Sequence, residues 1–184
     1  MTPELRARID AAVVMTELED IYLPYRPKRR TRATIAREKG LEPLALIIME
    51  QKERDPRNKA GEFLNDDVKS ADEAIAGACD IIAEWISEDE KARRQLRRLF
   101  EREAVVFSKV VKGKEAEGIK FSDYYDWSEP LRKCPSHRLL AMRRGEDEGF
   151  LRLSIEPDEK NALDILNSIF IKGANESSDL VGEA

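Results

Sequence analysis

Two Ser-x-x-Glu sequences mark where helices begin in the middle of this chain. Ser70 and Glu73 form the first, and Ser87 and Glu90 form the second. In such a capping box, the serine hydroxyl and the glutamate carboxylate accept hydrogen bonds from backbone N–H groups that the first helical turn leaves free. Apolar residues follow each box at helical spacing, which predicts two amphipathic helices. Their expected apolar positions are Ile75, Ala78, Cys79, Ile82 and Ile86 in the first, and Leu96, Leu99 and Phe100 in the second.

A helix is also expected near the start of the chain. Thr2 can supply the N-cap, Pro3 the first helical position, and Glu4 an acid near the positive end of the helix dipole. Apolar residues continue at helical spacing as far as Ile21. Pro24 ends the helix, because the residue before a proline is driven out of the helical region.

Two short helices are then predicted on either side of a glycine. The first runs from Arg32 to Lys39 and has Gly40 as its C′ residue, and the second runs from Leu41 to Gln51. This order resembles a helix-turn-helix corner in shape. The polar run at 51–61, with Pro56 in it, is expected to be a connection. Leu44, Ile47 and Ile48 are the expected buried residues of the second helix.

β-Structure is expected in the second half of the chain. Leu151, Leu153 and Ile155 alternate along the run 150–157, which indicates a strand. A single strand is marginal and needs a partner. The β-branched run 105–111 is one candidate, and a strand outside this chain is another. That run could also prolong the preceding helix, although an extended conformation is favoured.

Two further helices complete the predicted fold. Ser136 can cap a helix over 137–144 that ends at Gly145, and residues 158–171 form a last amphipathic helix. Residues 173–184 have little apolar content and are expected to be a linker. The fold class is mainly α: a multi-helix array with a helix-turn-helix-like corner and one or two short β-strands.

Composition excludes several classes of function. The chain has 184 residues and a net charge of −5, with one histidine and two cysteines. The pattern of charged and apolar residues predicts neither a signal peptide nor a membrane-spanning segment. Two cysteines cannot form a disulfide framework, so a cytoplasmic location is expected. His137 has no organised nucleophile beside it, and neither a metal-ligand cluster nor a phosphate-binding glycine loop is present. We therefore expect a protein that is not an enzyme, binds no metal or cofactor and does not insert into a membrane.

One stretch is strongly basic although the chain is acidic overall. "YLPYRPKRRTRATIAREKG" spans residues 22–40, and two prolines stiffen its start. The arginines and lysine could contact phosphates from a loop that leads into a helix. They could equally form internal ion pairs, for instance with Glu17, Glu19 or Asp20. The candidate residues for binding nucleic acid or a partner are Arg26, Lys28, Arg29, Arg30, Arg32 and Arg37.

Two weaker basic clusters follow. The first forms one helix face with i, i+4 spacing, where a solvated role is expected. It consists of Arg93, Arg94, Arg97 and Arg98, and the second consists of Lys109, Lys112 and Lys114.

The amino-acid sequences of several segments resemble those of the Tex family of bacterial transcription accessory proteins. The segments are "LEDIYLPYRPKRRTRATIAREKGLEPLA", "SKVVKGKEAEG", "KFSDYYDWSEPL" and "PSHRLLAMRRGEDEGFLRLSI". Family members are several times longer and also carry an RNase-H-like domain of the YqgF type, helix-hairpin-helix modules and a C-terminal RNA-binding OB-fold. The resemblance therefore implies a fragment of the N-terminal helical region at 1–172, followed by a linker at 173–184 toward a YqgF-like domain.

The resemblance implies a non-catalytic helical scaffold that supports nucleic-acid binding in transcription. Its implied partners are RNA or DNA, bound weakly, RNA polymerase, and the remaining domains of the full-length protein. The alternative is a protein-interaction module whose basic loop docks on RNA polymerase or on those other domains.

Overall fold

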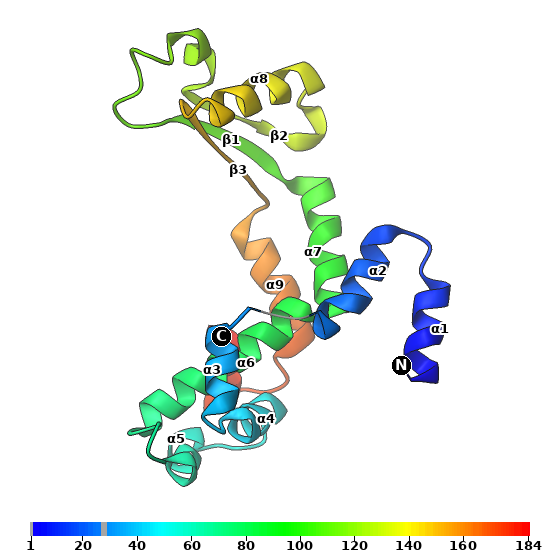
Figure 1. Ribbon diagram of the computed structural model, residues 1–184, viewed down its shortest axis with the longest axis vertical. Coiled ribbons are helices and arrows are strands. Elements are labelled where there is room, and N and C mark those ends of the chain that lie inside the picture. Colours follow the sequence, from blue (N-terminus) through cyan, green and yellow to red (C-terminus); the bar gives the residue numbers. More distant parts are fainter. Residues whose placement is uncertain (1, 27–28) are drawn as a thin grey trace. The chain divides into compact units, whose positions relative to one another are not determined.

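The structure, a computed structural model, describes residues 2–26 and 29–184. It is mainly helical with one small sheet, as predicted (Figure 1). In chain order the elements are α1 (Pro3–Ala11), α2 (Met15–Tyr22), η1 (Leu23–Tyr25), α3 (Arg32–Glu38), α4 (Glu42–Glu50), α5 (Pro56–Ala60), η2 (Gly61–Phe63), α6 (Ala71–Glu88), α7 (Glu90–Glu103), β1 (Val105–Val110), η3 (Ile119–Tyr124), β2 (Asp126–Pro130), η4 (Leu131–Lys133), α8 (Ser136–Asp147), β3 (Leu151–Glu156), α9 (Glu159–Phe170) and α10 (Glu176–Glu183), where η denotes a 3-10 helix.

The chain divides into two compact units. The first unit runs to Arg93 and resumes at Leu166–Ala184, and the second unit is the continuous stretch Arg94–Ile165. Both boundaries fall inside helices, one in α7 and one in α9. The second unit is therefore an insertion into the sequence of the first.

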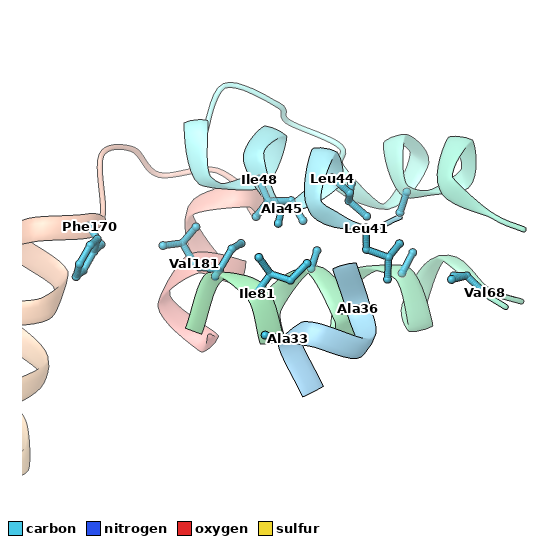
Figure 2. Packing of buried hydrophobic residues seen from close by; sticks show 14 of the residues in the cluster. Ala33, Ala36, Leu41, Leu44, Ala45, Ile48, Val68, Ile81, Phe170 and Val181 are labelled. Atoms are coloured by element: carbon cyan, nitrogen blue, oxygen red, sulfur yellow. The ribbon is translucent and has the colours of Figure 1, made fainter. Parts of the chain in front are cut away.

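The core of the first unit forms around α6, with α3, α4 and α10 contributing buried side chains (Figure 2). Leu44 and Ile48 are fully buried, as predicted, whereas Ile47 is only half-buried. Gly77 of α6 lets α3 and the corner approach closely, since a Cβ there would lie 2.5 Å from a Leu41 methyl carbon and 3.3 Å from the Ala36 Cβ. Gly40 takes the left-handed conformation, at φ 81°, that the predicted corner requires.

The capping prediction is confirmed at one site and wrong at the other. The Ser70 hydroxyl accepts from the Glu73 N–H, so α6 begins where expected. Ser87 instead lies in the last turn of α6 and donates to the Glu84 carbonyl. Asp89 caps α7 instead, by accepting a hydrogen bond from the Ala92 N–H at 2.7 Å. Asp89 directly precedes the helix, and aspartate is among the preferred N-cap residues.

The predicted first helix is two helices. Thr2 and Pro3 start α1 as expected, but Ala12 and Val14 are extended, and α2 begins at Met15. The Glu17 carboxylate accepts from the Val13 N–H at 3.0 Å, which supports the new helix start. The adjacent β-branched residues Val13 and Val14 favour this break in the helix.

The polar run after α4 is more ordered than a simple connection. Gln51 adopts the left-handed conformation and is 6% exposed. Its side-chain amide donates to the Phe170 carbonyl at 2.7 Å and accepts from the Lys172 N–H at 2.8 Å. Pro56 then opens the short helix α5. The glutamine therefore ties this run to the C-terminal segment.

The expected linker at 173–184 contains a packed helix, α10. Asn175 caps it by accepting from the Ser178 N–H, and the Ser177 hydroxyl donates to the Glu53 carbonyl at 2.8 Å. Val181 is 3% exposed in the core. The small number of apolar residues conceals this helix in the sequence, because two buried serines take the place of larger side chains.

The second unit contains an antiparallel sheet in the order β2-β1-β3. It confirms the strands expected near 105–111 and 150–157, and it pairs them with each other, Val106 opposite Ile155. The 3-10 turn η3 and the third strand, β2, lie in the segment "KFSDYYDWSEPL", where no strand was predicted.

Helix α8 extends beyond the predicted stop at Gly145. That glycine is buried, and a Cβ on it would lie 2.6 Å from a Leu151 methyl carbon and 3.2 Å from a Phe121 ring carbon. Gly145 therefore lets Leu151 and Phe121 pack closely against the helix. The left-handed residue that follows the helix is Gly149, at φ 78°.

Candidate nucleic-acid interface

The basic corner lies between η1 and α3. Pro24 is part of the 3-10 turn that ends at Tyr25, and Arg26 follows it in an extended conformation. Arg26 and Arg29 are exposed, and within residues 2–26 and 29–184 neither belongs to an ion pair. Lys28, also a predicted contact, lies outside the described residues. The two arginines therefore present uncompensated charge to solvent.

Arg30 and Arg32 form surface ion pairs. Arg30 lies 2.8 Å from Glu38, and Arg32 lies 3.2 Å from Asp80. The Arg32 side chain is 86% exposed even so. Ion pairs on a surface contribute at most about 1 kcal/mol, so a phosphate can compete with these carboxylates.

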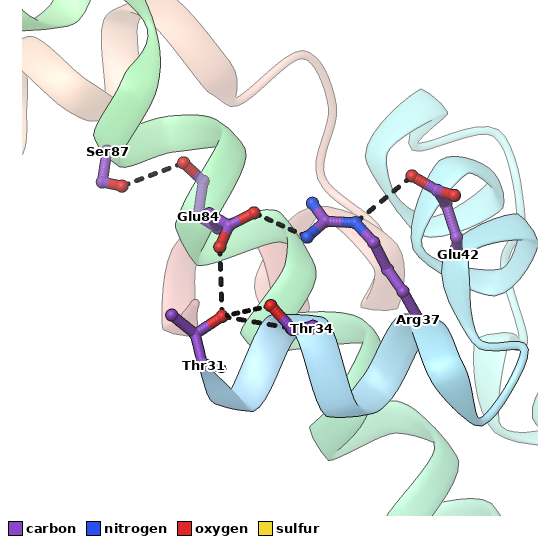
Figure 3. A network of polar contacts seen from close by, with 6 residues as sticks. All are labelled: Thr31, Thr34, Arg37, Glu42, Glu84 and Ser87. Carbon is purple, nitrogen blue, oxygen red and sulfur yellow. Dashed lines mark hydrogen bonds and ion pairs between the residues drawn. The ribbon is translucent and has the colours of Figure 1, made fainter. Parts of the chain in front are cut away.

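Arg37 is half-buried and pairs with two carboxylates (Figure 3). Its Nη1 lies 2.6 Å from Glu84 Oε1 and its Nε lies 3.4 Å from Glu42 Oε1. Burial alone would lower the pKa of Arg37, but the hydrogen bonds and charges of Glu84 and Glu42 outweigh it and raise the pKa. Arg37 therefore joins α3 to α6 and α4, which is the role of an internal ion pair.

The hydroxyl groups of the corner are also used internally. Thr31 caps α3 by accepting from the Thr34 N–H at 3.1 Å, and its hydroxyl lies 3.3 Å from Glu84 Oε2 (Figure 3). The hydroxyls of Thr31 and Thr34 are 3.0 Å apart. The hydroxyl groups of both threonines therefore bond within the first unit.

Sequence reasoning missed the two carboxylates that neutralise part of the corner. Asp80 and Glu84 are four residues apart on α6 and pair with Arg32 and Arg37. The i, i+4 spacing of two acids on a predicted helix was the signal that could have revealed an anionic face. Glu38 and Glu42, which are close in sequence, pair with Arg30 and Arg37, whereas in the described part of the chain Glu17 bonds to the Val13 N–H and to none of these arginines.

The second basic cluster is not simply a solvated helix face. Arg93 donates to the buried carboxylate of Asp20 at 2.7 Å, so it is a structural residue of the first unit. Arg94 and Arg98 are exposed. In the third cluster, Lys114 pairs with Glu117 at 2.7 Å.

Residues that could do chemistry are dispersed. His137 is exposed in the first turn of α8. Burial, together with a hydrogen bond to Glu129, raises the pKa of the Cys134 thiol to about 11. Across the part of the chain that the structure describes, no three histidine, cysteine or acidic side chains gather as a metal ion would require. In the same part, no helix has the length and apolar content to cross a membrane.

These features define a mainly helical module of two compact units that presents a partly neutralised cationic corner. A family model described as "Tex central region-like" matches residues 51–178. The chain therefore belongs to the Tex family, as the sequence resemblance implied.

Three curated bacterial relatives support this assignment. Transcriptional accessory protein Tex of Neisseria gonorrhoeae is 45% identical over 161 residues, which cover 86% of this chain and 21% of the relative. Protein tex of Bordetella pertussis is 45% identical, with coverage of 84% and 20%. Protein YhgF of Escherichia coli is 46% identical, with coverage of 86% and 21%. The chain thus spans about a fifth of the length of the relatives it matches.

Proposed function

We propose that this chain is a non-catalytic helical scaffold of a transcription accessory protein, and that its basic corner contacts nucleic-acid phosphates. The observation that carries the proposal is the exposure of Arg26 and Arg29 without ion pairs in the described part of the chain. The name of the Neisseria gonorrhoeae relative, transcriptional accessory protein Tex, supports a link to transcription. Such a role would be carried out in the bacterial cytoplasm.

The arginines of the corner would have two different roles in this function. Arg26, Arg29, Arg30 and Arg32 would each neutralise a phosphate and release counterions, which favours binding at low salt. Arg37 would position them, because its ion pairs with Glu84 and Glu42 hold α3 against α6 and α4. Contacts with phosphates alone give no sequence preference.

A salt titration tests this proposal. If the four arginines contact phosphates, log affinity for duplex DNA should fall with log salt concentration at a slope of about −3 to −4. The double variant R26A/R29A should reduce the magnitude of that slope by about 2 at an unchanged melting temperature. The variant R132A/K133A removes two exposed charges elsewhere and serves as the matched control. Absence of binding at low salt, or equal slopes for both variants, would refute phosphate contact by the corner.

A second candidate function is docking on another protein or on other domains of the full-length protein. The supporting observation is an apolar groove of about 440 Å³ between α1 and α2, which reaches to Tyr25 beside the corner. Tyr22 and Tyr25 are each more than half exposed there. An arginine corner beside an apolar groove suits an acidic partner that also carries apolar side chains, and RNA polymerase is one candidate. Loss of partner capture in Y22S/Y25S, with duplex binding unchanged, would favour this function.

A nuclease assay tests the non-catalytic part of the proposal. Purified chain incubated with labelled RNA and DNA in the presence of Mg²⁺ should leave both intact. Cleavage that co-purifies with the chain and responds to substitution of its residues would overturn this part.

A further inference from the structure

One face of the sheet in the second unit is covered. Val106 and Ser108 of β1 point to this face and are fully buried. Helix α8 packs against β3, and its Met142 is also fully buried. The Arg138 guanidinium of the same helix lies 5.0 Å from the ring centroid of Trp127 on β2. This face belongs to the core of the unit.

The opposite face of the sheet is open. Strand alternation places Phe107 and Lys109 of β1 on it, together with Ser154 and Arg152 of β3. A groove of about 400 Å³ runs along this face, and these four residues contribute to its lining. The groove lies wholly within the second unit.

An aromatic ring with a serine on either side forms the middle row of the open face. Phe107 lies opposite Ser128 on β2 and opposite Ser154 on β3. Its side chain is 37% exposed, although an aromatic residue on a central strand would ordinarily be covered. The ring can stack on a planar group, and the two hydroxyls can bond to the edge of that group.

Two cations face each other in the next row. Lys109 lies directly opposite Arg152 on the neighbouring strand, and both are exposed. Like charges in such a pair destabilise a sheet. Neither residue forms an ion pair within the described ranges, although Asp126 is the other cross-strand neighbour of Lys109 and Glu156 lines the far end of the groove. An anion bound over the two cations would remove their repulsion.

We infer that this open face, centred on Phe107, Lys109 and Arg152, binds a single strand of nucleic acid. A base would stack on Phe107 while phosphates of the strand contact Lys109 and Arg152. A duplex fits less well, because its bases are stacked on each other and offer no free face. An apolar helix also fits less well, since serines and charges surround the one aromatic ring. The inference rests on the proposed nucleic-acid role of the chain but uses other residues.

Fluorescence anisotropy with a short labelled oligouridine tests the inference on the whole chain. The F107L variant keeps an apolar side chain but loses the ring, so it should bind at least about fivefold more weakly than wild type. The F107Y variant keeps the ring and should bind like wild type. In K109A/R152A, the magnitude of the salt slope for the single strand should fall by about 1.4. R132A/K133A is the charge-matched control, and unchanged melting temperatures exclude loss of the fold.

The outcomes separate this inference from the corner hypothesis. If F107L binds oligouridine as tightly as F107Y does, or if the chain binds no single strand at low salt, the inference is overturned. If R26A/R29A leaves duplex binding unchanged while F107L still weakens binding of the single strand, the corner hypothesis fails and the sheet site stands. The inference would also be overturned if F107L retained binding of the single strand but lost capture of a protein on the Phe107 face.

Discussion

Asp20 of α2 is 3% exposed, and its carboxylate accepts a hydrogen bond at 2.7 Å from the Nε of Arg93, which is 73 residues away in the sequence. Arg93 also donates to the Ser87 carbonyl at 3.3 Å. This bridge joins α2 to the start of α7 within the first unit. Arg93 is therefore a structural residue at the start of α7 and not a solvated charge.

Replacing Arg93 with alanine should destabilise the first unit. A hydrogen bond to a charged group contributes about 1.5–3 kcal/mol, so R93A should lower the free energy of unfolding by an amount in that range. Urea denaturation followed by circular dichroism measures it. The neighbouring variant R94A removes an exposed arginine and should change stability by less than about 0.5 kcal/mol. Equal stabilities of R93A and R94A would contradict a structural role for the bridge.

Arg37 and the exposed arginines of the corner should respond differently to substitution. R37A should lower the free energy of unfolding by about 1–3 kcal/mol, because it leaves the 10%-exposed Glu84 side chain without its 2.6 Å contact to Arg37. R37K should restore only part of the loss, since an ammonium group cannot replace the planar fork that reaches both Glu84 and Glu42. R26A/R29A should leave the melting temperature unchanged. Thermal unfolding of the three variants checks this, and full rescue by R37K would argue against the two-carboxylate arrangement.

Acid should weaken the second unit through Glu129. Burial raises the pKa of this carboxyl, but hydrogen bonds from Cys134, Arg138 and Trp127 outweigh it and leave the pKa below the ordinary value of 4.5. The unfolded chain therefore takes up this proton first as pH falls. The stability contributed by Glu129 should be fully present above about pH 4.5 and lost progressively below it.

Melting temperatures from pH 7 down to pH 3 measure this effect. The E129Q variant should show a shallower acid dependence than wild type. Glu73 offers a parallel case in the first unit, because its hydrogen bond with Lys39 also lowers its pKa. Identical pH profiles for wild type and E129Q would show that the Glu129 interactions do not stabilise the fold.

The two cysteines should resist alkylation in the folded chain. Burial is the main reason that the pKa of Cys79 rises to about 11, and the charges of Glu183 and Asp80 add to it. The pKa of Cys134 also rises to about 11. At pH 8 the thiolate is then roughly a hundredfold scarcer than in an unfolded chain, and iodoacetamide should react correspondingly more slowly.

Mass spectrometry with and without urea gives the two rates. The C134S variant isolates the reaction of Cys79. Native labelling at the rate seen in urea would show that these thiols are not protected.

Local sequence signals recovered much of the fold. Ser70 and Glu73 located the start of α6, Gly40 located the corner, and alternation of Leu151, Leu153 and Ile155 located β3. These signals succeed because caps, left-handed turns and strand alternation depend on a few neighbouring residues.

The failures involve interactions between distant parts of the chain. Helix α10 is held by the hydrogen bond from the Ser177 hydroxyl to the Glu53 carbonyl. Gly145 lies inside a helix because the Leu151 side chain occupies the position that a Cβ would take. The Asn175 cap of α10 is visible in the sequence, but the distant groups that these residues contact are not. The same holds for the corner, where the partners of Arg32 and Arg37 lie on α6. The sequence could identify the charges but not which of them the fold neutralises.

The insertion of one unit into the other sets an order of events during synthesis on the ribosome. The second unit is continuous from Arg94 to Ile165, so it can fold as soon as that stretch has emerged. The first unit must wait, because Phe170 and Val181 complete its core and the Gln51 side chain bonds to the Phe170 carbonyl. Until then α4 and α6 lack part of their apolar covering. The apolar faces of these early helices therefore stay partly uncovered until the C-terminal segment has been synthesised.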